Sequence, residues 1–288
     1  MIDSLKDFKD TFFYPKTTFS SRGKLIDWSK PAVMGIINVT PDSFFDGGVN
    51  NSIARALAKV AEMVTAGVDI IDIGGYSSRP HAIDISESEE TARIIPVINA
   101  VRKQYPLLLL SVDTFRAAVA QKAIESGVDM VNDITGGVFD EMMFDVVAKN
   151  DVIYCMMHMR GTPQTMMQQT DYKDIISDII QFFIEQLKKA RDKGIKDIIL
   201  DPGFGFAKTE AQNYYLLKEL EVFKIFELPI LIGISRKSMV YKTLNRSASE
   251  ALNGSTVLHT IALQKGAKII RVHDVTEVKE AIELLKKL

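Results

Sequence analysis

Length, composition and charge limit what this protein can be. Its 288 residues, 47% of them hydrophobic, can bury a sizeable core, and no composition shift or Pro/Gly-rich linker divides them. The formal charge of -2 and the pI near 6.1 provide no basic field, so we expect neither nucleic acid nor a membrane surface as a partner. The single cysteine, Cys155, excludes an intrachain disulfide, and the amino terminus lacks an apolar signal segment, so we expect a cytoplasmic protein.

The predicted strands are short apolar runs rich in Val and Ile. Residues 1–30 precede the first run, and we expect Phe19–Leu25 with its neighbours to form a hairpin that closes one end of the fold. Eight runs follow, at Val33–Asn38, Asp69–Ile73, Leu107–Asp113, Met130–Asp133, Val152–Met157, Ile198–Asp201, Ile230–Gly233 and Ala267–Val272. Runs of this kind are typical of the buried strands of a parallel sheet.

Amphipathic stretches with a helical period fall between and after these runs. They lie at Ser52–Ala66, Glu87–Lys103, Arg116–Ser126, Glu141–Lys149, Asp174–Lys193, Ala211–Leu220, Glu250–Lys265 and Val275–Lys287. Four helices end before a glycine that would adopt the left-handed conformation of a C-cap, at Gly67, Gly127, Gly194 and Gly266. The recurrence of this ending predicts a repeated strand–helix unit.

Strict alternation of strands and helices predicts a (β/α)8 TIM barrel, although an open doubly wound sheet would give a similar pattern. The polar residues favour the barrel, because they lie at or just beyond the carboxyl ends of the strands: Asn38, Gly74-Gly75, Asp113, Asn132-Asp133, His158, Asp201, Ser235 through Lys237, and Arg271 with His273. In a barrel these ends meet at one mouth. We therefore expect an N-terminal extension over residues 1–30, packed on a single barrel domain over residues 31–288.

The segment Asn38–Gly48 carries the first functional signal. It replaces the apolar run before it with amide, hydroxyl, carboxylate and glycine groups, and it includes two aromatic residues among acids. Such a loop on a rigid scaffold is typical of an enzyme site. Simpler interpretations exist for single residues: Asp113 or Asp201 could cap a helix, Arg271 could form a surface ion pair, and Phe44 could anchor a loop. The occurrence of these groups at separate strand ends favours a common site.

Several motifs, each after a predicted strand, resemble those of the dihydropteroate synthases. They are Asn38–Gly48, Gly74-Gly75-Tyr76-Ser77-Ser78-Arg79-Pro80, Ser111-Val112-Asp113-Thr114, Val131-Asn132-Asp133-Ile134, Met157-His158-Met159, Asp201-Pro202-Gly203-Phe204-Gly205-Phe206, Ser235-Arg236-Lys237-Ser238 and Arg271-Val272-His273-Asp274-Val275. The resemblance covers roughly residues 18 to 288. Any one motif is weak evidence, but the full series in this order is specific.

The resemblance implies condensation of 6-hydroxymethyl-7,8-dihydropterin diphosphate with 4-aminobenzoate, giving 7,8-dihydropteroate and diphosphate. A pterin ring presents donors and a carbonyl along one edge, so its site needs carboxylate, amide and cationic partners. Asp113, Asn132, Asp201 and Lys237 are of these types and match the family's pterin-binding set. His158 follows an apolar strand, and we interpret it as a core imidazole or a supporting group and not as a catalyst.

Loss of diphosphate requires cations and directed N–H donors. By resemblance, Arg271 and His273 bind the diphosphate at the start of the last helix, and Asn38 binds both diphosphate and a Mg²⁺ ion. A single amide is a poor Mg²⁺ site, so the substrate must supply much of the coordination. The family is thought to break the carbon–oxygen bond first, which needs no strong general base. The implied catalytic residues are Asp46, Lys237, Arg271 and His273, with Asp46 facing the pterin cation.

By resemblance, 4-aminobenzoate binds between loops, with Phe44, Ser78, Arg79, Pro80 and Ser238 as its candidate contacts. The two apolar side chains suit a benzene ring, and a helix start at Ser238 suits its carboxylate.

The second loop departs from the family, which commonly has Ser-Thr-Arg-Pro-Gly where this chain has Ser77-Ser78-Arg79-Pro80-His81. Serine keeps the hydroxyl, whereas histidine in place of glycine restricts the loop and adds a titratable group. We expect activity, with altered affinity for the aminobenzoate and its sulfonamide mimics.

Two other functions are compatible with a pterin-binding barrel. A methyltransferase domain that holds methyltetrahydrofolate has no use for the first loop or for Arg271-Val272-His273. The presence together of Asn38, Asp46, Lys237 and Arg271 argues against a non-catalytic relative that only binds pterin. We therefore expect a dihydropteroate synthase. The resemblance also implies a homodimer formed through helices on the outside of the barrel.

Overall fold

A barrel of eight parallel strands forms the body of the protein. The computed structural model describes residues 16–40, 49–78 and 84–288. The eight strands are hydrogen-bonded in the order β8-β7-β6-β5-β4-β3-β10-β9. The two outer strands of this series meet through a bridge between Leu200 and Ile230 and a hydrogen bond from Leu200 N to Pro229 O of 3.0 Å. The sheet therefore closes on itself, which confirms the predicted barrel and excludes an open sheet.

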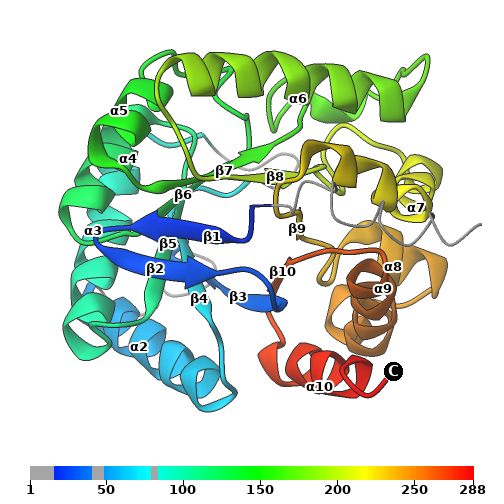
Figure 1. Ribbon diagram of the computed structural model, residues 1–288. Coiled ribbons are helices and arrows are strands. Elements are labelled where there is room, and N and C mark those ends of the chain that lie inside the picture. Colours follow the sequence, from blue (N-terminus) through cyan, green and yellow to red (C-terminus); the bar gives the residue numbers. More distant parts are fainter. Residues whose placement is uncertain (1–15, 41–48, 79–83) are drawn as a thin grey trace, which may run out of the picture.

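Strands and helices alternate along the chain, and the helices surround the barrel (Figure 1). The strands of the barrel are β3 (Ala32–Asn38), β4 (Ile70–Gly74), β5 (Leu109–Asp113), β6 (Met130–Asp133), β7 (Ile153–Met157), β8 (Ile198–Asp201), β9 (Leu231–Ile232) and β10 (Ile269–Val272). The α-helices are α2 (Val49–Thr65), α3 (Glu87–Gln104), α4 (Ala117–Glu125), α5 (Met143–Asn150), α6 (Ile175–Asp192), α7 (Glu210–Lys218), α8 (Ser238–Thr243), α9 (Leu252–Gln264) and α10 (Val275–Leu285). Short 3-10 turns lie at η2 (Met166–Gln168), η3 (Leu220–Phe226) and η4 (Ala248–Glu250).

The predicted hairpin consists of β1 (Thr18–Ser21) and β2 (Lys24–Asp27), and it lies across one end of the barrel (Figure 1). Phe19 and Trp28 are 1% and 2% exposed, and their rings meet edge to face at 6.0 Å between centroids. They pack in one cluster with a ring of interior side chains near the amino ends of the strands, which are Met34, Ile70, Met130, Ile153, Ile199, Leu231 and Ile269. The hairpin therefore closes the amino-terminal end of the barrel, as predicted.

The predicted ends of several elements differ from the observed ones. The run predicted as Leu107–Asp113 begins at Leu109, because the Arg102 guanidinium holds the carbonyls of Pro106 at 2.9 Å and Leu108 at 2.7 Å outside the sheet. The helix α8, which is six residues long, was not among the predicted helical stretches, although a helix start was expected at Ser238. Backbone bonds to β3 already begin one residue before β10, where Lys268 O accepts from Ala32 N at 2.8 Å, so this strand differs from the predicted Ala267–Val272 only at its first residues.

The predicted glycine endings are confirmed, with positive φ angles at Gly67, Gly127, Gly194 and Gly266. Gly127 illustrates the reason: at φ +106 it turns the chain from α4 into β6, while its carbonyl accepts two bonds from Arg102. No helix within the described ranges is both long and apolar enough to span a membrane.

Candidate active site

Side-chain alternation along the strands explains why one end of the barrel interior is apolar and the other polar. Residues two apart on a strand point to the same face. Moving two residues on from the apolar ring closed by the hairpin reaches Asp72, Ser111, Asn132, Cys155, Asp201 and Arg271. Two further residues along β3 and β5 reach Asn38 and Asp113. The polar groups therefore face the carboxyl-terminal mouth of the barrel, where the sequence predicted the site.

Strand register also places predicted site residues side by side. Asn38 pairs with Gly74, Gly74 pairs with Asp113, and Asp113 pairs with Asn132, across four adjacent strands. Neighbouring strands lie roughly 4.8 Å apart. Residues separated by up to 94 positions in the sequence thus form one row at the mouth, with a glycine in the second place of the row.

Arg271 joins this row from β10. Its Nε donates to Asp72 Oδ2 at 2.6 Å and its Nη2 donates to Asp113 Oδ2 at 2.6 Å. Asn132 Nδ2 donates to the same oxygen of Asp72 at 3.0 Å. With the Arg271 side chain only 18% exposed, this is a buried network, so the simpler interpretation of Arg271 as a surface ion pair is wrong.

Asp72 is the main residue of this network that sequence reasoning missed. It is fully buried at the centre of β4, between Ile71 and Ile73. An ionisable side chain inside an otherwise apolar strand is itself a signal, because a buried carboxylate needs a partner. That partner is Arg271, 199 positions away in the sequence.

The pKa of Asp113 is raised to about 7, because burial and, to a smaller extent, the nearby Asp72 carboxylate outweigh the opposing effect of Arg271. Two carboxyl groups share one guanidinium, so a proton is retained on the group more readily than on an isolated aspartate. The arrangement can accept hydrogen bonds from a guanidine-like edge and can also hold a proton near neutral pH.

Asp201 and Lys237 form the second half of the site. Asp201 is buried, and its Oδ1 accepts from Gly203 N at 2.7 Å. Lys237 is half-buried, with its Nζ donating to Phe204 O and lying 4.6 Å from the centroid of the Phe206 ring. Burial lowers the pKa of Lys237 to about 8, while Asp201 opposes this shift. Burial also raises the pKa of Asp201, and Lys237 is the main group that opposes it.

Neither aspartate is a helix cap, so the capping interpretation is wrong. The N-cap of α4 is Arg116 and the N-cap of α7 is Thr209. Asp113 contacts Arg271, and the Asp201 carboxylate accepts from Gly203 N in the turn that follows it. Ser238 does begin a helix, α8, as predicted, and it is exposed.

His273 and the loop after β9 are braced together. His273 Nδ1 lies 3.0 Å from Ser235 Oγ, and the Arg236 guanidinium donates to both oxygens of Asp274 at 2.9 and 2.6 Å. Arg236 has φ +54, a left-handed conformation that is held by these bonds and by Ser255, which accepts from its backbone N at 3.0 Å. The loop that carries Lys237 is therefore fixed to the start of α10.

An apolar wall lies beside the polar groups. Ile134, Met157, Met159, Met166 and Ala207 form one buried cluster, against which Phe115 and Phe206 pack. Met157 is the last residue of β7 and the others follow β5, β6, β7 and β8, so the wall belongs to the same mouth. A site with convergent polar groups and an apolar wall suits a flat heterocycle.

His158 is a core imidazole, in agreement with its interpretation from the sequence. It is 2% exposed, its ring meets Phe182 edge to face at 5.0 Å, and its Nδ1 lies 3.0 Å from Lys208 Nζ. Burial lowers the pKa of His158 well below its usual value, and the Lys208 charge adds to this shift. Lys208 was not predicted, although it lies two residues beyond the motif that runs from Asp201 to Phe206.

Some predicted residues cannot be placed. Phe44, Asp46, Arg79 and Pro80, together with the departing His81, lie outside the described residues. Ser78 is described and is partly exposed. Within the described ranges, no group of three or more His, Cys, Asp or Glu side chains could hold a metal ion.

The model for the family described as "Pterin binding enzyme" matches residues 34–273. The chain is similar to the dihydropteroate synthase of Escherichia coli (strain K12), at 42% identity over 92% of this chain and 94% of that protein. It is 44% identical to the dihydropteroate synthase of Synechocystis, over 95% of each protein.

Solved structures give the same result. A crystal structure of the Yersinia pestis dihydropteroate synthase with a sulfonamide drug complex superposes with a TM-score of 0.88 at 42% identity, covering 94% of this chain and 98% of that one. The Xanthomonas albilineans dihydropteroate synthase with 4-aminobenzoic acid gives 0.87 at 35% identity, covering 94% and 97%. The chain therefore belongs to the dihydropteroate synthases, transferases of folate biosynthesis within the pterin binding enzymes.

Proposed function

We propose that this dihydropteroate synthase uses the polar mouth of its barrel to hold a pterin diphosphate while diphosphate leaves. The observation that carries the proposal is the buried network of Arg271, Asp72, Asp113 and Asn132, which comes from four strands and faces the Asp201–Lys237 pair. Asp113, Asn132 and Asp201 would accept from and donate to the pterin edge, and Lys237 would donate to its carbonyl.

The chemical step separates charge. The bond between the pterin methylene and the diphosphate oxygen breaks, its electron pair leaves with the diphosphate, and the amine of 4-aminobenzoate then attacks the methylene and loses a proton. The neutral amine needs no strong base, so the protein's task is to stabilise an anion on one side and a cation on the other. Arg271, His273 and Lys237 would serve the anion, and Asp46 the cation.

The Arg271 guanidinium can bond the carboxylates of Asp72 and Asp113 and a phosphate group at the same time. A guanidinium has five N–H donors in a fixed plane, and two of them bond Asp72 and Asp113. The carboxylates fix the plane of the group, and the remaining donors would face a phosphate. This shared contact links the pterin-binding residues directly to the diphosphate-binding residues, so filling one half of the site would orient the other.

We propose Mg²⁺ as a participant that enters with the diphosphate. Among the described residues Asn38 is the one ligand that the family resemblance provides, and the described acids form no metal cluster. The donor set fits an ion held mainly by substrate oxygens, which is the usual mode for this cation. When bound, Mg²⁺ would neutralise charge on the leaving group.

The second substrate, 4-aminobenzoate, would bind at Phe44, Ser78, Arg79, Pro80 and Ser238. Two observations support this: Ser238 is exposed at the start of α8, and the neighbouring Lys237 points to the ring of Phe206. Replacing Ser78 or Ser238 with alanine should raise the KM for 4-aminobenzoate and leave the pterin KM unchanged, and an effect on the pterin alone would reject the assignment.

A reaction assay tests the proposal as a whole. Purified protein is mixed with the pterin diphosphate and labelled 4-aminobenzoate, with Mg²⁺ or with a chelator, and both dihydropteroate and diphosphate are measured. We expect equal amounts of the two products, and much slower turnover with the chelator. If folded protein released neither product, the reaction would be wrong, and full activity in the chelator would remove Mg²⁺ from the proposal.

We also propose a cytoplasmic location, which cell fractionation can check.

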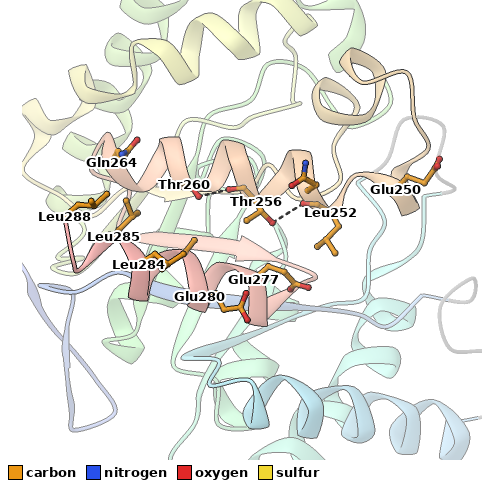
Figure 2. Close-up of a pocket in the computed structure, with 12 residues that line it drawn as sticks. Glu250, Leu252, Thr256, Thr260, Gln264, Glu277, Glu280, Leu284, Leu285 and Leu288 are labelled. Carbon is orange, nitrogen blue, oxygen red and sulfur yellow. Dashed lines mark hydrogen bonds between the residues drawn. The ribbon is translucent and has the colours of Figure 1, made fainter.

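We propose that the protein forms a homodimer. A groove lies on the outside of the barrel between α9 and α10 (Figure 2). Figure 2 shows Thr256 and Thr260 on α9, each donating to a carbonyl one turn back, and Leu284, Leu285 and Leu288 along the other side. Leu284 is 71% exposed and Leu288 is 98% exposed. We assign this groove to a second copy of the chain because water-exposed leucines gain from such burial.

A further inference from the structure

A buried lysine stands behind the site. Lys208 follows the turn after β8 and is 2% exposed. Its Nζ lies 3.0 Å from His158 Nδ1 and donates to Gly203 O at 2.9 Å and to Phe206 O at 3.0 Å. An ammonium group has three N–H donors, and three acceptors surround this one.

The partners of Lys208 are unusual for a buried cation. All three acceptors are neutral groups, since His158 must be unprotonated at Nδ1 to accept from an ammonium. Burying a charge without a carboxylate in contact is costly, and burial lowers the pKa of Lys208 to about 7. A methionine or leucine would fill such a position at less cost. This cost suggests a task beyond packing.

Lys208 bonds the turn at residues 203–206, and this turn contacts both Asp201 and Lys237. Gly203 donates its N–H to Asp201 at 2.7 Å, and its carbonyl accepts from Lys208. Phe206 accepts from Lys208 through its carbonyl and faces Lys237 with its ring. Lys208 therefore bonds the carbonyls of Gly203 and Phe206, the two residues that contact Asp201 and Lys237.

The turn packs closely against the backbone at the end of β7, and this contact fixes its position. A side chain at Gly203, which has φ +75, would place its Cβ 2.0 Å from the carbonyl oxygen of His158. The backbone N–H of His158 in turn donates to Asp201 O at 2.9 Å. The ends of β7 and β8 and the turn are thus packed against each other around the Lys208–His158 contact.

We propose that Lys208, with His158 as its neutral partner, is a positioning residue that fixes Asp201 and Lys237 for the pterin. The inference rests on the proposed pterin role of those two residues. Lys208 is not proposed to touch substrate. It acts through the carbonyls of Gly203 and Phe206 and through its charge, which lies close enough to Asp201 to favour the ionised carboxylate.

The charge gives a readout that a packing role would not move. The groups that face Asp201 are Lys237, Lys208, Arg271 and the Cys155 thiol. The three cations lower the pKa of Asp201 against the effect of burial. Removing one of them should raise that pKa, so pterin affinity should be lost at a higher pH than in the wild type as the solution is acidified.

The test uses full-length Lys208→Met, which keeps the length of the side chain without its charge. Calorimetry with the pterin diphosphate should give a Kd weaker by about tenfold or more, since small misplacements in a site have effects of this order. The KM for 4-aminobenzoate should stay within about twofold, and the acid limb of pterin binding should move to higher pH. Lys218→Met on α7, whose side chain is 75% exposed, is the matched control and should match the wild type.

A second pair of variants covers the case in which Lys208→Met does not fold. His158→Gln retains an acceptor for the ammonium, whereas His158→Leu does not, so pterin affinity should fall for leucine and be largely restored for glutamine. The inference is overturned if Lys208→Met binds pterin diphosphate with wild-type affinity and an unmoved acid limb, or if the two His158 variants behave alike. Failure of the wild type to bind pterin diphosphate would instead reject the proposed pterin site itself.

Discussion

At the scale of single residues, the site depends on buried cations and carboxylates that lie close together. Arg271 contacts Asp72 and Asp113, while Lys237 and Lys208 lie near Asp201. These charges are buried together, so removing one leaves others without compensation, and the loss is larger than that of a surface pair. Each substitution here should therefore be read for both folding and function.

Replacing Arg271 with alanine should lower kcat by about 10²-fold, as expected for loss of a group that stabilises developing charge. It should also lower the free energy of unfolding, because Asp72 and Asp113 would lie buried without their cation. Steady-state kinetics with both substrates saturating, on protein checked by thermal melting, measures the effect. Arg271→Lys is the control: it keeps the charge but cannot bridge both carboxylates, so its activity should be intermediate. A wild-type kcat in Arg271→Ala would refute the diphosphate role.

The alkaline limb of pterin binding should reflect Lys237, whose pKa burial lowers to about 8. Above that pH the ammonium becomes neutral, so the KM for pterin diphosphate should rise from pH 7 to pH 9, whereas Lys237→Arg should keep its affinity because arginine stays charged.

The contribution of Lys237 to the free energy of unfolding should rise with pH between about pH 8 and pH 10.5, in the opposite sense to its contribution to pterin affinity. The folded-state pKa of Lys237 is below its ordinary value of 10.5. Between the two values the unfolded chain binds more protons, so the contribution of this lysine to the free energy of unfolding rises with pH. Chemical denaturation of the wild type and of Lys237→Met across this range separates the two effects. A KM that does not depend on pH up to 9 would contradict the assignment.

At the scale of elements, the hairpin and the loops at the carboxyl ends of the strands have separate roles. The hairpin closes the amino end with Phe19 and Trp28, and Ser20 N and Ser21 Oγ bond Asp197 Oδ2 and Asp129 O at 2.7 Å each. The loops at the other end carry the site. Stability and chemistry should therefore be separable by mutation.

Replacing Trp28 with alanine should lower the free energy of unfolding by about 3–5 kcal/mol, the range for a large buried aromatic side chain. Turnover of the protein that remains folded should change little, because the site lies at the opposite end of the barrel. Urea denaturation and kinetics on the same sample measure the two quantities. Leu25→Ala, at a position 78% exposed on the same hairpin, should cost less than about 0.5 kcal/mol. A kcat loss in Trp28→Ala equal to that in Arg271→Ala would show that the two ends are coupled.

At the scale of the whole molecule, barrel closure brings together groups from both halves of the chain. Arg271 and Asp72 meet although 199 positions separate them. The outer helices leave the α9–α10 groove facing solvent (Figure 2). The proposed dimer would cover this groove and leave the mouth open to both substrates.

A charged residue in the groove should split the dimer. Leu284→Lys would place an ammonium in an apolar contact, so sedimentation velocity should find monomers at concentrations where the wild type is dimeric. Leu107→Lys, at a position 84% exposed before β5, is the control and should leave the dimer intact. Unchanged sedimentation of Leu284→Lys would place the interface elsewhere, and a monomeric wild type would reject the dimer.

Predictions from the sequence were strongest where a local pattern has one structural solution. The apolar runs gave all eight strands, and the endings at Gly67 and Gly127 gave the start of the next strand. The aromatic hairpin was also found. Strand ends were less accurate, since a distant guanidinium such as that of Arg102 can hold a segment outside the sheet.

The sequence by itself determined the barrel and the residue types at its mouth, because hydrophobic period and turn residues act over short distances along the chain. Only the tertiary structure decided which side chains contact each other. It shows that Asp72 and Asp113 share Arg271, that Asp113 and Asp201 cap no helix, and that Lys208 lies beneath the site. These pairings depend on burial and on distances across the closed barrel, which no local pattern of residues encodes.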